Sequence, residues 1–247
     1  MPTASPVRWI ALLLVGICLV FTLNGCALWH SIFGDEDDLT PVELMADGME
    51  EFNSGNFEAA AEIFQKIKDR YPYSKHATQA ELKMADAQYE KGLFDEAYDS
   101  YTEFEKLHPK HPAIPYVMFH KGMCHFKRVS TIDRDQSYTR KAKEEFERLI
   151  QMYRKSPYAE QARRRVRDCY IKLAEHEIYV GDFYFKMAKY GPAMKRYLYL
   201  IQHYPDVGQY YEALEKIKIC KEKIAEGKDK EMSWWGGLRH SFLSLFD

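Results

Sequence analysis

The chain has 247 residues, of which 46% are hydrophobic, 29% charged and 15% aromatic, and its formal net charge is −2. This length is ample for a sizeable core, and the balanced charge excludes a general polyanion or nucleic-acid binder, because no basic stripe is evident. With only 13 glycines and 10 prolines, a β-sandwich or a long disordered tract is disfavoured. The composition favours an all-α protein whose aromatic side chains pack between helices.

Residues 1–25 are predicted to be a lipoprotein signal peptide that is removed. The apolar run Trp9–Leu23 is shorter than the about 20 residues that a membrane span needs, and it suits the core of a signal peptide. It ends in Leu23-Asn24-Gly25-Cys26, which resembles a bacterial lipobox. We therefore expect an N-acyl chain and S-diacylglycerol on Cys26, which anchor the protein to a membrane, and no other cofactor. An uncleaved signal anchor is the alternative.

Residues 26–40 are predicted to be a lipidated acidic tether, followed by a folded domain over 41–227 and an amphipathic tail over 228–247. The first helix is expected to begin at Thr40-Pro41-Val42-Glu43, which supplies a cap residue, a proline and the glutamate of a capping box. Ala27 replaces the aspartate that often keeps lipoproteins in the inner membrane. The absence of aspartate at this position favours the outer membrane, where we expect the protein on the periplasmic face.

Small and aromatic residues recur in the folded domain in the order of a tetratricopeptide repeat. Small residues would let paired helices approach, and aromatic rings would fill the gaps between successive pairs. The four clear units are Gly48, Gly55, Phe57, Ala60, Phe64 and Pro72; Ala85, Gly92, Phe94, Ala97, Tyr101 and Pro109; Gly122, Phe126, Ala142 and Phe146; and Gly181, Phe185, Tyr190, Ala193, Tyr197 and Pro205. The third unit contains an insertion between its helices.

This repeat predicts a right-handed α-solenoid of about ten antiparallel helices in five tetratricopeptide-like pairs. The expected helices are 42–54, 57–71, 75–91, 94–107, 113–127, 136–154, 158–172, 174–188, 190–203 and 208–226. No proline or glycine separates 158–172 from 174–188, so one long helix over 157–189 is the alternative.

Catalytic and metal-binding motifs are missing from the sequence. It contains no Gly-rich phosphate loop, no Gly-x-Ser-x-Gly elbow and no His-Glu-x-x-His. Once the signal is removed and Cys26 is lipidated, Cys124, Cys169 and Cys220 remain, and we expect them to be buried thiols rather than zinc ligands or a disulfide framework. An enzyme is therefore strongly disfavoured, and no metal site is predicted.

Several local motifs are more specific than the repeat itself. With the lipobox and the inserted third repeat, the chain resembles the BamD family, the lipoprotein subunits of the outer-membrane β-barrel assembly machinery. The matching segments include Phe64–Ser74, His108-Pro109-Lys110-His111-Pro112, Asp133-Arg134-Asp135, Ser156-Pro157-Tyr158-Ala159, Leu173-Ala174-Glu175-His176-Glu177 and Lys195-Arg196. A different tetratricopeptide-repeat lipoprotein scaffold, such as a pilotin-like or cell-envelope coordination protein, is the alternative.

The resemblance implies two binding surfaces without catalysis. The first repeats would receive the C-terminal segment of unfolded outer-membrane β-barrel proteins, with Asn53, Gln79, Asp86, Tyr89 and Tyr116 as groove candidates. The polar residues among them are the stronger candidates, because polar side chains gain little from burial.

The last repeats would bind a POTRA domain of BamA through Arg196 and the third-repeat loop residues Asp133, Arg134 and Asp135. Other lipoproteins of the same machinery are further expected partners. For Arg196 an intramolecular ion pair is the alternative role, and for the loop a simple helix cap.

In the tail, the large apolar residues Trp234, Trp235, Leu238, Phe242, Leu245 and Phe246 fall near helical spacing. We expect a short amphipathic element that packs on the last helix pair or engages a partner.

Overall fold

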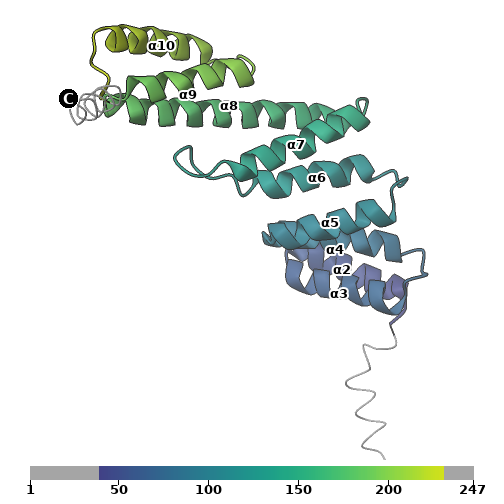
Figure 1. The fold of residues 1–247 in the computed structure, drawn as a ribbon. Helices are drawn as coiled ribbons and strands as arrows, with labels where there is room; N and C mark the ends of the chain where they lie inside the picture. Colours follow the sequence, from purple (N-terminus) through teal and green to yellow (C-terminus); the bar gives the residue numbers. More distant parts are fainter. Residues whose placement is uncertain (1–38, 231–247) are drawn as a thin grey trace, which may run out of the picture.

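The structure, a computed structural model, describes residues 39–230, and it is all-helical over that range (Figure 1). The predicted signal peptide, Cys26 and residues 231–247 of the tail lie outside the described residues. The helices are α2 (Pro41–Ser54), α3 (Phe57–Arg70), α4 (Ala77–Lys91), α5 (Phe94–Leu107), α6 (Ile114–Phe126), α7 (Ser137–Met152), α8 (Pro157–Lys186), α9 (Tyr190–His203) and α10 (Tyr210–Ala225).

Local sequence signals set the ends of several helices. The Thr40 hydroxyl accepts a hydrogen bond from the Glu43 N–H, and the Glu43 carboxylate accepts one from the Thr40 N–H, as the predicted capping box requires. The helices α2 and α4 end at Gly55 and Gly92, whose left-handed φ values of 85° and 87° glycine adopts without a steric penalty. At the same place after α8, Ala188 has a φ of 59° and is the only described non-glycine residue with positive φ.

Successive helices pack mainly on their neighbours in the chain, which gives the stacked, elongated shape in Figure 1. The hairpins are α2–α3, α4–α5, α6–α7 and α8–α9, and α10 packs on α9. The described chain thus has nine helices, because the two helices predicted over 158–172 and 174–188 form the single helix α8. The first half of α8 packs on α7 and its second half on α9, since no residue between them breaks the hydrogen-bond ladder.

The repeat positions do the packing that their residue types suggest. A Cβ atom on Gly48 would lie 2.6 Å from Phe64 Cε1, and one on Gly181 would lie 2.4 Å from Tyr197 Cε1. These glycines are therefore required by the close approach of an aromatic ring from the second helix of the hairpin. At the turn of the second repeat, Tyr89 packs edge-to-face on the ring that opens the next helix, with centroids 5.6 Å apart. The equivalent rings of the first and fourth repeats pack in the same way.

Buried side chains form three core clusters along the stack, centred on α2–α4, on α4–α8 and on α8–α10. The three cysteines of the described chain, Cys124, Cys169 and Cys220, are buried free thiols as predicted. Within residues 39–230, no helix is long and apolar enough to cross a membrane. The same residues contain no group of three or more His, Cys, Asp or Glu side chains placed to hold a metal ion.

Candidate binding surfaces

The five residues predicted to line a groove for unfolded client proteins lie on α2, α4 and α6, the first helices of the first three hairpins. Asn53 near the end of α2 and Gln79 near the start of α4 are exposed, and Tyr116 on α6 is half-buried. Tyr89 and Asp86 on α4 are buried, at 9% and 5% exposure. Of the five candidates, Asn53, Gln79 and Tyr116 thus remain accessible, whereas Asp86 is enclosed despite its charge.

Asp86 is buried because its carboxylate has three donors. It accepts hydrogen bonds from the hydroxyls of Tyr101 at 2.8 Å and Tyr116 at 2.7 Å, and from Lys83 Nζ at 2.8 Å. Burial, reinforced by the negative charge of Asp86, raises the pKa of both tyrosines, so both hydroxyls remain donors. Asp86 therefore joins α4, α5 and α6 and fixes the position of Tyr116. The expectation that polar groove candidates stay accessible, because they gain little from burial, missed this role.

A row of aromatic and cationic groups continues across the first helices of the hairpins. Lys83 Nζ lies 5.4 Å from the ring centroid of Phe52 on α2, and the ring of Tyr116 packs edge-to-face on Tyr158 of α8, 5.5 Å away. Apolar faces interspersed with polar groups suit an extended peptide with alternating aromatic side chains. The N-terminal surface is defined here by the accessible candidates Asn53, Gln79 and Tyr116, with the buried Asp86 and Tyr89 behind them.

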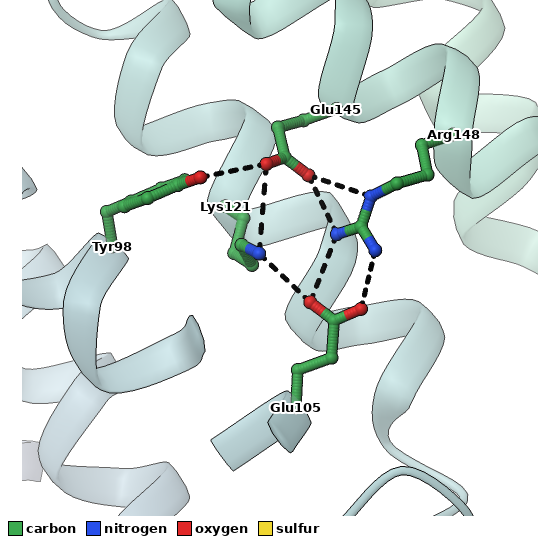
Figure 2. Close-up of polar contacts among 5 residues, drawn as sticks. All are labelled: Tyr98, Glu105, Lys121, Glu145 and Arg148. Carbon is green, nitrogen blue, oxygen red and sulfur yellow. Dashed lines mark hydrogen bonds and ion pairs between the residues drawn. The ribbon is translucent and has the colours of Figure 1, made fainter. Parts of the chain in front are cut away.

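Five side chains from α5, α6 and α7 form a second polar assembly, the central ion cluster, shown in Figure 2. Arg148 donates two hydrogen bonds to the Glu105 carboxylate, at 2.6 and 3.0 Å, and a further one to Glu145 at 2.9 Å. Lys121, 5% exposed, lies 2.9 Å from Glu105 and 3.7 Å from Glu145, and the Tyr98 hydroxyl donates to Glu145 at 2.9 Å.

The central ion cluster is electrically balanced, with two carboxylates and two cations. Burial alone would raise the pKa of Glu105, but hydrogen bonds from Arg148 and Lys121 lower it to about 2. Hollows of about 390 and 530 Å³ flank the cluster, yet its charges already have partners. The cluster thus fastens the second hairpin to the third. No local sequence pattern indicates this cluster, because its members are far apart in the chain.

The predicted BamA-facing residues lie near the second half of α8. Arg196 on α9 is exposed, and its Nη1 lies 3.2 Å from Oε2 of Glu177, whose side chain is 8% exposed. The intramolecular ion pair that was the alternative role for Arg196 is therefore present. The rest of the guanidinium faces outward, since 44% of the side chain remains exposed.

The third-repeat loop reaches the same part of α8. His176, adjacent to Glu177, bonds through Nδ1 to the carbonyl oxygen of Ile132 at 2.6 Å, which ties the loop to α8. The buried Gln136 amide donates to the carbonyls of Thr131 and Arg134 at 2.9 and 3.0 Å and holds the loop's shape. These positioning contacts are of a kind that sequence spacing does not reveal.

Within that loop, Asp133, Arg134 and Asp135 are all exposed. A hydrogen bond from Thr131 lowers the pKa of Asp133, and one from Ser137 lowers that of Asp135. Asp135 accepts a 3.0 Å bond from the Ser137 N–H at the start of α7, so the helix-cap alternative holds for this residue. Asp133, Arg134, Asp135 and Arg196 are the C-terminal surface, because both of its parts are attached at residues 176–177 of α8.

Comparison with known proteins supports the resemblance seen in the sequence. Residues 37–233 match the YfiO family of outer membrane lipoproteins, which covers every described helix. The chain belongs to this family. Outer membrane protein assembly factor BamD from Neisseria meningitidis serogroup A is 27% identical over 227 residues, spanning 87% of this chain and 85% of that protein. The factor of the same name from Vibrio cholerae is 27% identical over 210 residues, spanning 78% of this chain and 87% of its own.

Solved structures are similar at lower identity. PcrH from Pseudomonas aeruginosa is 20% identical and covers 55% of this chain and 93% of its own, with a TM-score of 0.42. The TPR2AB domain of yeast Sti1 is 19% identical and covers 76% of this chain and 75% of its own, with a TM-score of 0.42. The family's BamD relatives are named as assembly factors, and a non-catalytic scaffold is what the sequence of this member predicts.

Proposed function

We propose that this chain is a lipid-anchored subunit of the machinery that assembles β-barrels into the outer membrane. It acts as a non-catalytic scaffold that binds BamA and receives unfolded outer-membrane proteins. The match of residues 37–233 to a family of outer membrane lipoproteins, with relatives named as outer membrane protein assembly factors, carries this proposal.

Two separated surfaces suit two simultaneous ligands. The N-terminal surface offers the exposed amides of Asn53 and Gln79 and the half-buried ring of Tyr116, which suits an extended client segment with alternating aromatics and a terminal carboxylate. The C-terminal surface offers a guanidinium and an acid-rich loop, which suits a charged face of a folded POTRA domain. Because each hairpin packs mainly on its neighbours, a change at one surface has little effect at the other.

The C-terminal surface is tested by charge reversal. Arg196→Glu should weaken BamA capture roughly tenfold to a few hundredfold, because it places a carboxylate where a guanidinium meets the partner. Lys195→Glu is the matched control, since it makes the same charge change at the neighbouring exposed position of α9. Glu177→Gln removes only the internal partner of Arg196, and it should leave capture within a few-fold.

The outcomes separate the alternatives. If the folded Arg196→Glu variant binds BamA at full affinity, the proposed interface is wrong. If Glu177→Gln weakens capture as strongly as Arg196→Glu, then Arg196 acts by holding α9 and does not touch the partner.

The N-terminal surface is tested with a peptide that carries the C-terminal sequence of an outer-membrane barrel. Glu at both Asn53 and Gln79 should weaken peptide binding at least tenfold and leave BamA capture unchanged. Gln151→Glu, on an exposed position of α7, is the control for added negative charge. Loss of both ligands in a folded Asn53/Gln79 variant would show a single shared site.

The anchor is tested separately at Cys26. Cys26→Ser should abolish incorporation of labelled palmitate and release the protein from the membrane fraction, because the lipid supplies the membrane affinity. Retention in the membrane without label would indicate an uncleaved signal anchor instead.

A further inference from the structure

The second half of α8 presents an apolar stripe that no described element covers. Tyr179 and Phe183 of α8 and Met187, its C-cap residue, follow one another at four-residue intervals and are 44%, 54% and 44% exposed. Residues four apart in a helix lie on one face, so the three side chains form a continuous strip about 12 Å long. The opposite face of α8 packs on α9 through Ala174, Ile178 and Gly181. This α8 stripe is thus the unpartnered side of a helix whose other side is core.

The chain leaves the described structure at the end of this same stripe. After α10 it returns to the corner between α8 and α9, where Asp229 is 3% exposed and its Oδ2 accepts a 2.6 Å hydrogen bond from the Gly191 N–H. The next residue, Lys230, donates its N–H to the carbonyl of Ala188 at 3.0 Å. Residue 231 therefore follows a residue that is bonded to the chain neighbour of Met187, at the end of the stripe.

The sequence that follows fits the stripe in length and pattern. Residues 231–247 would span about 25 Å as a helix, enough to run back past Tyr179. At about 100° per residue, the six large apolar side chains of this C-terminal segment fall within an arc of about 120°, a single apolar face. These side chains are Trp234, Trp235, Leu238, Phe242, Leu245 and Phe246.

We infer that the C-terminal segment, residues 231–247, folds back antiparallel to α8 and covers Tyr179, Phe183 and Met187 with its apolar face. Another exposed apolar pair near the end of the stack, Tyr211 and Leu214, is a poorer docking site. It lies at the start of α10, about 20 Å along that helix from its end, and the chain leaves α10 in the direction of α8. The docked segment would close the last hairpin from the side opposite to α9.

Trypsin cleavage after Arg239 in the full-length protein tests this docking, because proteolysis follows the fraction of time that a segment is open. Phe183→Ser should speed the release of residues 240–247 about tenfold, as expected when burial of one phenylalanine side chain is lost. Tyr211→Ser is the control, because Tyr211 is also an exposed aromatic side chain, on α10, and this change should leave the rate unchanged. Circular dichroism confirms that both variants stay folded.

A cysteine pair gives a second, independent measurement. Phe183→Cys with Leu238→Cys should form an intramolecular disulfide under mild oxidation, whereas Tyr211→Cys with Leu238→Cys should not. The inference is overturned if Phe183→Ser leaves the cleavage rate unchanged, or if Tyr211→Ser accelerates it instead. Protection of Arg239 that depends on protein concentration or on added lipid vesicles would also overturn it, because the segment would then have another seat.

Discussion

The second and fourth hairpins of this solenoid share one contact, a tyrosine hydroxyl that donates to an aspartate, but the other partners of the aspartate differ. In α4–α5 the Tyr101 hydroxyl donates to Asp86 at 2.8 Å, and in α8–α9 the Tyr197 hydroxyl donates to Asp182 at 2.6 Å. The two pairs occupy the same repeat positions. In the first and third repeats the corresponding aromatic residues are phenylalanines, and methionines stand where the aspartates are.

The hairpin that follows decides how each pair is completed. The helix α6 covers Asp86 and contributes the Tyr116 hydroxyl, so the carboxylate is interior. In the described chain the α8–α9 hairpin is followed by the single helix α10; Lys216 from that helix approaches the Asp182 carboxylate at 2.5 Å, and 34% of the Asp182 side chain stays exposed. The interior carboxylate of Asp86 therefore has two hydroxyl donors besides Lys83, whereas the more exposed Asp182 has one hydroxyl donor and Lys216.

Removal of each aspartate in turn should give the largest difference in stability between the two hairpins. Asp86→Ala should lower the free energy of unfolding by about 3 kcal/mol, because two buried hydroxyls and Lys83 lose their acceptor. Asp182→Ala should cost about 1 kcal/mol, because water can reach Lys216 and the tyrosine hydroxyl. Urea unfolding followed by circular dichroism measures both. Equal losses would mean that the cover provided by α6 contributes nothing.

Acid should act on the second repeat through the central ion cluster. The pKa of Glu105 is lowered from 4.5 to about 2, so its stabilising contribution is complete above about pH 4.5 and is lost as the pH falls toward 2. The loss should reach roughly 2 kcal/mol.

The acid effect can be assigned with variants of α5. Glu105→Gln should flatten the decline of the unfolding free energy between pH 5 and pH 2 (both approximate), when compared with the wild type. Glu96→Gln, an exposed position on the same helix, should leave the slope unchanged. A Glu105→Gln protein with the wild-type acid slope would place the acid sensitivity elsewhere.

The small residue between the paired helices gives a third difference. The second repeat has Ala85 where the fourth has Gly181, and a Cβ atom on Gly181 would lie 2.4 Å from Tyr197 Cε1. Gly181→Ala should therefore cost about 1.5 kcal/mol through overpacking. The reverse change, Ala85→Gly, should cost about 1 kcal/mol through helix propensity. Thermal unfolding compares the pair, and a neutral Gly181→Ala would show that the Tyr197 ring can withdraw.

Much of the fold follows from local sequence signals. From the cap at Thr40, the glycines at 55 and 92 and the repeated aromatic positions, eight of the nine described helices are predicted with both ends within two residues of those observed. The division of α8 was wrong, because repeat counting supplied a boundary where the chain contains no breaker. A helix continues until a residue interrupts its hydrogen bonding, and no such residue lies between 158 and 186.

The candidate site was less predictable. Exposure of Asn53, Gln79 and Arg196 agrees with their polar character, but the burial of Asp86 depends on Tyr101 and Tyr116 from two other helices. The bond from His176 to the loop likewise joins residues far apart in the chain. Such contacts are set by how helices stack, and a single sequence carries no periodic signal for them.

The residue that ends the first helix of each hairpin offers the smallest and finest test. Gly92 after α4 and Ala188 after α8 occupy the same repeat position, and both have positive φ, 87° and 59°. A side chain in this region costs roughly 1–2 kcal/mol, whereas glycine adds unfolded-chain entropy of about 0.4–1 kcal/mol. Ala188→Gly should therefore stabilise the protein by about 0.5 kcal/mol.

The reciprocal change is the control. Gly92→Ala should destabilise the protein by about 1 kcal/mol, and urea midpoints at constant m-value measure both effects. Ala188 also accepts the Lys230 N–H through its carbonyl, an interaction that glycine can keep because it uses only the backbone. A loss of stability in Ala188→Gly would therefore point to the greater freedom of the glycine chain near the start of the C-terminal segment. In that case the left-handed residue after α8 would carry no strain, and the first helices of the second and fourth hairpins would end in equivalent turns.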